Sequence, residues 1–121
     1  MNITVCGTGY VGLVAAVVFA AKGHKVVGLD IDEAKIAMLK AGKSPLFEPG
    51  LEKLMGESAE NLRFTVDYRD AYADADMVFV AVPTPEKADG SAELSYVMAA
   101  CDQIAESRSA GCPVVIKSTV P

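Results

Sequence analysis

The sequence has few of the residues from which metal centres and disulfide frameworks are built. It contains one histidine and three cysteines, Cys6, Cys101 and Cys112. An odd number of cysteines cannot form a complete disulfide set, and their spacing does not match a metal-binding pattern. We therefore expect no metal site. We interpret Cys6 and Cys101 as small, buried hydrophobic residues rather than nucleophiles.

Basic runs and long apolar segments are missing as well. The formal net charge is −5, which argues against nucleic acids and anionic membranes as partners. The longest apolar stretch, 11–21, is interrupted by Gly12, is too short to span a bilayer, and has no basic region ahead of it as a signal peptide would. We therefore expect a cytoplasmic protein that binds neither nucleic acid nor membrane.

The first 30 residues, by contrast, carry a strong pattern of strand, glycine turn, helix and second strand. Gly7, Gly9 and Gly12 form a G-x-G-x-x-G motif between a short β-branched run and an apolar helical run. Asp30 ends the second strand, 18 residues after Gly12. This context is typical of a dinucleotide-binding turn. The alternative is a glycine-rich turn in an ordinary α/β domain, with a solvated Asp30.

Each glycine has its own physical task in this interpretation. Gly7 permits the tight turn out of the strand, Gly9 lets backbone approach a pyrophosphate, and Gly12 lets the helix pack against the sheet. The helix that begins near Tyr10 presents unpaired N–H groups and the positive end of its dipole to the phosphates. Asp30 can accept hydrogen bonds from both hydroxyls of an adenosine ribose. Its charge favours NAD over NADP, whose 2′-phosphate it would repel.

The rest of the chain alternates between strands and helices. Strands are predicted at 3–6, 25–30, 62–66, 77–82 and 113–117, and helices after Gly9 and at 33–41, 51–55, 67–73 and 94–106. The pattern predicts an α/β fold with a Rossmann-type, doubly wound parallel sheet in the strand order 3-2-1-4-5, in three α/β/α layers. In the first helix Val11, Val14, Ala15 and Val18 recur at helical spacing. In the last, Val97, Ala100, Cys101 and Ile104 are expected to face inward.

Residues 1–121 are expected to form one domain, the amino-terminal fragment of a longer enzyme. The chain stops at the end of a strand, where a ligand-facing loop should begin. Asp32 and Asp67 are predicted helix caps, and Gly23 is a predicted helix end. Glu48 lies on a proline-bounded loop, and we interpret its role as structural.

Five short motifs together resemble a known family. They lie at 7–12, 47–51, 82–85, 89–94 and 117–121. In this order they resemble the amino-terminal domain of the UDP-glucose/GDP-mannose dehydrogenase family, over the whole chain. The resemblance implies an NAD-dependent oxidoreductase of nucleotide-sugar metabolism. Such an enzyme oxidises the C6 alcohol of a sugar nucleotide, here expected to be UDP-glucose, to a carboxylate with two NAD molecules and a covalent thiohemiacetal on a cysteine.

The resemblance also implies roles for individual residues. The turn 7–12, with Tyr10 and Val11, would hold the pyrophosphate of NAD, and Asp30 and Lys35 would contact the adenosine ribose. The rest of the cofactor would be lined by Val82, Pro83, Thr84, Pro85, Ser118, Thr119 and Val120. The Thr119 hydroxyl would also help to hold a catalytic water. Lys35 could equally be a solvated helix lysine, and Thr84 a plain turn residue.

The chain departs from the family pattern at one position, which we interpret as neutral, and it lacks the family's catalytic groups. Position 93 is Glu where the family often has Asp, at the entrance of a predicted helix. The family's nucleophilic cysteine lies far downstream, and Cys6, Cys101 and Cys112 do not match its motif. We therefore expect the fragment to be inactive, with the sugar nucleotide bound through domains beyond it in a homo-oligomeric parent protein. The alternatives are a dehydrogenase of GDP-mannose or a UDP-N-acetyl sugar, and a non-catalytic NAD-binding regulatory module.

Overall fold

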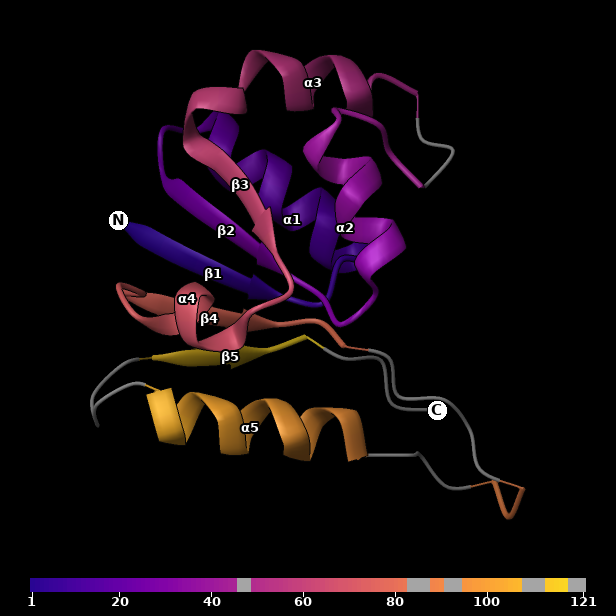
Figure 1. The fold of residues 1–121 in the computed structure, drawn as a ribbon, viewed down its shortest axis with the longest axis vertical. Coiled ribbons are helices and arrows are strands. Elements are labelled where there is room, and N and C mark those ends of the chain that lie inside the picture. Colours follow the sequence, from indigo (N-terminus) through magenta and orange to yellow (C-terminus); the bar gives the residue numbers. More distant parts are fainter. Residues whose placement is uncertain (46–48, 83–87, 91–94, 108–112, 118–121) are drawn as a thin grey trace.

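A parallel sheet of five strands forms the centre of the molecule (Figure 1). The computed structural model describes residues 1–45, 49–82, 88–90, 95–107 and 113–117. The strands are β1 (Asn2–Cys6), β2 (Lys25–Leu29), β3 (Leu62–Thr65), β4 (Met77–Val80) and β5 (Val114–Ile116), in the order β3-β2-β1-β4-β5. The predicted fold class and strand order are confirmed.

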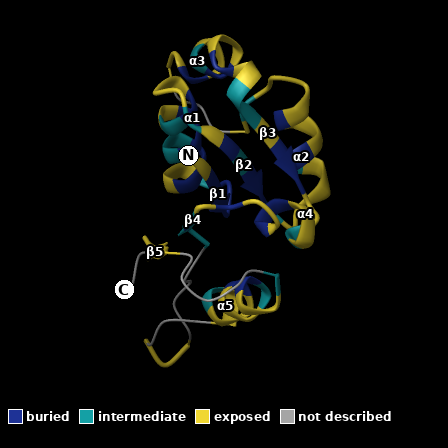
Figure 2. Cartoon of the chain, turned by 90° about the vertical axis from the view of Figure 1, so that its left-hand side faces the viewer, coloured by how far each residue is buried: buried dark blue, intermediate teal, exposed yellow. Residues whose placement is uncertain are grey.

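Helices cover both faces of this sheet. They are α1 (Tyr10–Ala21), α2 (Glu33–Lys40), α3 (Leu51–Glu57), α4 (Tyr68–Tyr72) and α5 (Ser95–Ser107), with a short 3₁₀ turn η1 (Ala59–Asn61). Side chains of β1 alternate between the faces: Ile3 and Val5 pack with Ala16 of α1, whereas Cys6 packs with residues of α4 and α5. Figure 2 shows the central strands buried between the helices, with β5 exposed at the edge of the sheet.

Local chemistry at the helix ends agrees with the sequence. The side chain of Asp32 accepts a hydrogen bond from the Lys35 amide at 3.0 Å, and that of Asp67 accepts one from the Arg69 amide at 3.0 Å. Gly23 has φ +95° immediately after α1, a backbone conformation that glycine adopts without strain. The predicted caps of α2 and α4 and the predicted end of α1 are confirmed.

The rotation of α1 about its axis was not predictable from spacing. The helix carries no charged residue and is apolar on every side, so several stripes at helical spacing compete. The face that packs on the sheet contains Leu13, Ala16, Val17 and Ala20, whereas Val11 and Val18 are exposed. The stripe of 11, 14, 15 and 18 is therefore not the buried one.

The inward face of α5 also differs from the prediction. Ala100 and Ile104 are buried, but Cys101 is exposed and Val97 is only half-buried. Cys101 follows Ala100, so it is rotated by about 100° around the helix away from the sheet. The interpretation of Cys101 as a buried hydrophobic residue is wrong. Four predicted strands also extend one or two residues beyond the observed pairing, at 25–30, 62–66, 77–82 and 113–117.

Candidate functional site

The carboxyl ends of the strands open onto one cavity of about 650 Å³. Backbone hydrogen bonds hold these ends together: the Gly7 amide donates to the Leu29 carbonyl at 2.7 Å, and the Ala81 amide donates to the Cys6 carbonyl at 2.8 Å. Strand β1 lies between β2 and β4, so the order of the strands reverses at this point. Open α/β sheets bind ligands at such switch points.

The cavity brings together many of the residues singled out from the sequence. Its lining includes Gly7, Gly9, Tyr10, Val11, Asp30, Lys35 and Val82. Gly12 lies behind the turn rather than on the wall. The predictions for Pro83, Thr84, Pro85, Ser118, Thr119 and Val120, and for Glu48, fall outside the described residues. Lys117, just before the last of these segments, does line the cavity.

The three glycines of the turn differ in what surrounds them. Gly7 has φ +97°, and a Cβ there would lie 2.6 Å from the Ala81 carbonyl oxygen. A Cβ at Gly12 would lie 1.8 Å from the Gly7 carbonyl oxygen, so helix α1 packs directly on the turn. Gly9 has an ordinary φ of −72°, and, apart from its own chain neighbours, no atom of the described residues would lie within 4 Å of a Cβ there. The space in front of Gly9 is therefore open to the cavity.

The amino end of α1 lacks the capping side chain that α2 and α4 have. No side chain caps Gly9, and no acidic residue lies in the first turn, whereas α2 and α4 are capped by aspartates. Gly9, Tyr10 and Val11 of this helix end line the cavity. Free N–H groups and the positive end of the helix dipole favour an anion here.

Asp30 is one of two aspartates, with Asp32, that line the cavity, and the protein holds it firmly. Its Oδ2 accepts hydrogen bonds from the Thr8 amide at 3.0 Å and the Thr8 hydroxyl at 2.7 Å, and its Oδ1 accepts one from the Asp32 amide at 3.0 Å. The Lys35 ammonium lies 3.6 Å from Oδ2. Burial acts to raise the pKa of the carboxyl, but these hydrogen bonds and the lysine charge outweigh it, so the pKa of Asp30 lies below its ordinary value.

Sequence reasoning missed Thr8, which is fully buried beneath the cavity and fixes the acid. The signal was present: a hydroxyl side chain stands between the first two glycines of the motif, where the motif itself specifies nothing. Apolar side chains at the mouth of the cavity were also missed, among them Ile31 at 78% exposed and Val66 at 41%. The cavity thus offers an anion-binding helix end, a fixed carboxylate and an exposed apolar wall.

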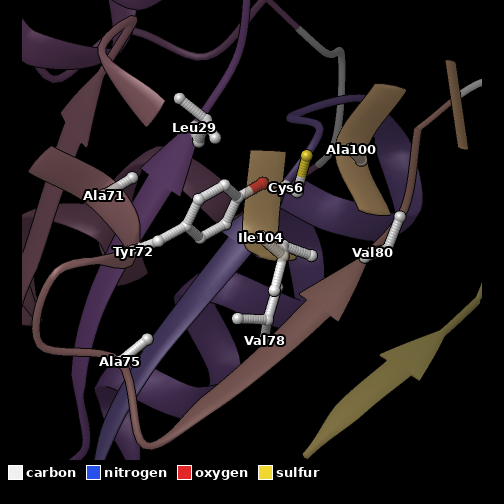
Figure 3. Close-up of a cluster of buried hydrophobic side chains, with 9 residues drawn as sticks. All are labelled: Cys6, Leu29, Ala71, Tyr72, Ala75, Val78, Val80, Ala100 and Ile104. Carbon is white, nitrogen blue, oxygen red and sulfur yellow. The ribbon is translucent and has the colours of Figure 1, made fainter. Parts of the chain in front are cut away.

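Cys6 lines the same cavity but is not built for nucleophilic chemistry. The residue is buried, and burial raises the pKa of its thiol, so the protonated form is favoured. Figure 3 shows the Tyr72 hydroxyl directed toward Cys6 within a cluster of aliphatic side chains. Cys112 lies outside the described residues. The prediction that Cys6 is buried is confirmed.

Metal clusters and membrane-spanning helices are both absent from the part of the chain that the structure describes. No cluster of histidine, cysteine and acidic side chains there could hold a metal ion. No helix among those residues is both long and apolar enough to cross a membrane.

Comparison with known proteins gives matches over the whole chain. The family model described as UDP-glucose/GDP-mannose dehydrogenase family, NAD binding domain, matches residues 1–121. The chain is 51% identical to a UDP-glucose 6-dehydrogenase of Rhizobium meliloti, with 100% of the chain and 28% of the relative covered. It is 40% identical to the GDP-mannose 6-dehydrogenase of Pseudomonas aeruginosa, with 99% and 29% covered. The chain therefore spans less than a third of the length of these relatives.

Solved structures give the same result. A ternary complex of GDP-mannose dehydrogenase from Pseudomonas aeruginosa superposes with a TM-score of 0.94 at 38% identity, with 99% of this chain and 29% of that chain covered. A UDP-glucose dehydrogenase from Pyrobaculum islandicum gives a TM-score of 0.92 at 43% identity, with 99% and 29% covered.

Proposed function

This chain belongs to the UDP-glucose/GDP-mannose dehydrogenase family as its NAD-binding domain, and we propose that it forms the amino-terminal cofactor domain of a longer UDP-glucose 6-dehydrogenase. UDP-glucose is the favoured substrate because relatives named UDP-glucose 6-dehydrogenase match at 42–51% identity, against 40% for a GDP-mannose 6-dehydrogenase. The single observation that supports cofactor binding most strongly is the placement of the glycine turn, the uncapped end of α1 and Asp30 around one cavity.

We assign the residues of the cavity to parts of NAD. The pyrophosphate lies in front of Gly9, against the N–H groups of Tyr10 and Val11, because this space is open and faces the positive end of α1. The adenosine ribose lies at Asp30 and Lys35. The nicotinamide half is proposed to extend past Val82, and Thr84 and Thr119 are proposed to contact it.

The reaction proposed for the parent enzyme is a four-electron oxidation. The C6 alcohol, two NAD⁺ and one water give the C6 carboxylate, two NADH and three protons, so each NAD⁺ accepts one hydride. Thr119 is proposed to position the water. The nucleophilic cysteine is proposed to lie beyond residue 121, because Cys6 is a buried thiol in a setting that disfavours the thiolate.

The 121-residue chain alone should therefore bind NAD but oxidise no sugar nucleotide. Hydride transfer requires the sugar to be held against the nicotinamide in near-attack geometry, and the groups that hold it are proposed to lie in later domains. The test is NADH formation from UDP-glucose and NAD⁺, followed by absorbance, for this chain and for the longer protein that contains it. Turnover by the longer protein alone is the expected result.

The other outcomes separate the alternatives. Turnover by the short chain would place the catalytic groups within residues 1–121 and would contradict the structural role of its cysteines. Turnover by the longer protein with GDP-mannose or a UDP-N-acetyl sugar, but not with UDP-glucose, would leave the enzyme class intact and change the substrate. NAD binding without turnover of any sugar nucleotide would favour a regulatory NAD-binding module.

A further inference from the structure

The residue between the first two glycines of the turn contacts the acid that follows β2. Thr8 places two donors on a single oxygen of Asp30, with its amide at 3.0 Å and its hydroxyl at 2.7 Å from Oδ2. An ionised carboxylate only accepts hydrogen bonds, so the Thr8 hydroxyl donates. Both bonds are assisted by charge and belong to the stronger class of hydrogen bonds in proteins.

We propose that Thr8 is a positioning residue for cofactor selection, which fixes the Asp30 carboxylate so that Oδ2 is fully occupied by Thr8 and Oδ1 keeps one acceptor position for the ribose. The inference rests on the proposed NAD-binding function. It assigns to a side chain within the glycine turn a role that the glycines themselves do not have.

The acceptor positions of Asp30 support this division. A carboxylate offers about four acceptor positions, two on each oxygen. Thr8 occupies both positions on Oδ2, and the Asp32 amide occupies one on Oδ1 at 3.0 Å. One position remains, on Oδ1. While its hydrogen bonds to Thr8 are in place, Asp30 therefore accepts a hydrogen bond from one ribose hydroxyl rather than two. The second hydroxyl is left to Lys35, whose ammonium lies 3.6 Å from Oδ2.

The fixed position of the Asp30 carboxylate also increases the preference for NAD over NADP. A free aspartate could rotate its carboxylate away from a 2′-phosphate and so reduce the repulsion. Asp30 cannot do so without breaking its bonds to Thr8, and its side chain is only 12% exposed. Discrimination against the wrong ligand depends on such rigid placement of the repelling group.

The methyl and the hydroxyl of Thr8 have separable surroundings. The methyl lies close to the backbone of Gly28, since a Cβ built on Gly28 would be 3.5 Å from it. The hydroxyl contacts Asp30. Thr8→Val keeps the volume and removes the hydroxyl, whereas Thr8→Ser keeps the hydroxyl and removes the methyl. Thr4→Val is a matched control. Thr4 is also buried, but its hydroxyl donates to the Ala71 carbonyl of α4 and not to Asp30.

The experiment measures NAD and NADP affinity by calorimetry for the wild type and these three variants, in the 121-residue chain and in the longer protein. Thermal unfolding reports the cost to the fold. We expect Thr8→Val to weaken NAD binding by roughly tenfold, as the loss of a hydrogen bond to a charged group implies. We also expect it to reduce the ratio of NAD affinity to NADP affinity. Thr8→Ser should retain the wild-type ratio of NAD affinity to NADP affinity. Thr4→Val should change the stability of the fold but neither the NAD affinity nor the NADP affinity.

A second measurement needs no cofactor. The titration of the Asp30 carboxyl, followed by carbon NMR, should move to higher pH in Thr8→Val and return toward the wild type in Thr8→Ser. The inference would be overturned if folded Thr8→Val kept the wild-type ratio of NAD affinity to NADP affinity and the wild-type titration of the Asp30 carboxyl. Thr8 would then be only a packing residue. If the wild type binds neither cofactor, the proposed function fails and the selection role fails with it. The titration then reports only whether Thr8 holds Asp30.

Discussion

Alanine substitutions at the three glycines of the turn should separate cofactor binding from folding. The perturbation is the same at each position, a single added Cβ. Its surroundings differ sharply: open space at Gly9, the Ala81 carbonyl oxygen at 2.6 Å from Gly7, and the Gly7 carbonyl oxygen at 1.8 Å from Gly12. We expect Gly9→Ala to remain folded but to bind NAD at least tenfold more weakly, whereas Gly12→Ala does not fold stably.

The magnitudes follow from these surroundings. At Gly9, alanine is a poorer helix cap than glycine, but it also restricts the unfolded chain by about 0.4–1 kcal/mol, so the free energy of unfolding should change by less than about 1 kcal/mol. At Gly7, the positive φ and the contact with Ala81 should together cost about 2 kcal/mol or more. At Gly12 backbone meets the new atom well inside van der Waals contact, and the cost should exceed about 4 kcal/mol.

At Gly9, the loss of NAD affinity should not be accompanied by a comparable loss of stability. A Cβ at Gly9 occupies the space that we assign to the pyrophosphate, so NAD affinity should fall at least tenfold, which is about 1.4 kcal/mol. Urea unfolding gives the stabilities and calorimetry gives the affinities, each against the wild-type chain. Wild-type NAD affinity in folded Gly9→Ala would refute the assignment of the phosphates to this turn. A stable Gly12→Ala would refute the close packing of α1 on it.

Three further predictions concern single side chains. Asp30→Ala should narrow the difference between NAD and NADP affinities, and calorimetry that shows a preference for NADP in the wild type would contradict the role of Asp30. The folded-state pKa of Asp30 is depressed, so its ionised form stabilises the fold at neutral pH and this contribution is lost as the pH falls through that pKa. In urea unfolding, Asp30→Asn should therefore be less stable than the wild type at pH 7, with the difference vanishing in acid; a constant difference would contradict the shift. In a Cys112→Ser variant, a thiol reagent should modify the exposed Cys101 in the native protein but Cys6 only after unfolding. Rapid modification of both thiols in the native protein would contradict the burial of Cys6.

The sequence was most informative where a local rule fixes the structure. Alternating strands and helices permit few topologies, so the parallel order β3-β2-β1-β4-β5 followed directly. Asp32 and Asp67 precede helical runs in which the backbone needs a cap, and both provide one. The glycine motif predicted the end of the sheet at which the cavity lies.

Prediction failed where two faces of a helix were similarly apolar, or where a residue's hydrogen-bond partner lies far away in the sequence. Helix α1 is apolar all round, and its rotation is set by the contact of Gly12 with the turn, which spacing does not reveal. Cys101 is apolar enough to be buried, but Ala100 occupies the inward position one residue before it. Thr8 was overlooked because its partner, Asp30, lies 22 residues away.

The pairing of β1 with β4 also determines when the cavity can exist during folding. Ile3 pairs with Met77, and the Ala81 amide donates to the Cys6 carbonyl, so the two walls of the cavity come from segments about 75 residues apart in the chain. Contacts of such separation form late because the loop between them must first be closed, at a cost in entropy. The first βαβ unit carries the whole glycine motif and Asp30, yet it lacks the wall that Ala81 and Val82 provide. Residues of α5 and Lys117 also line the cavity, so a nascent chain acquires the complete cavity only after residue 117 has been synthesised and these segments have docked. NAD can stabilise the native state fully only from that point on.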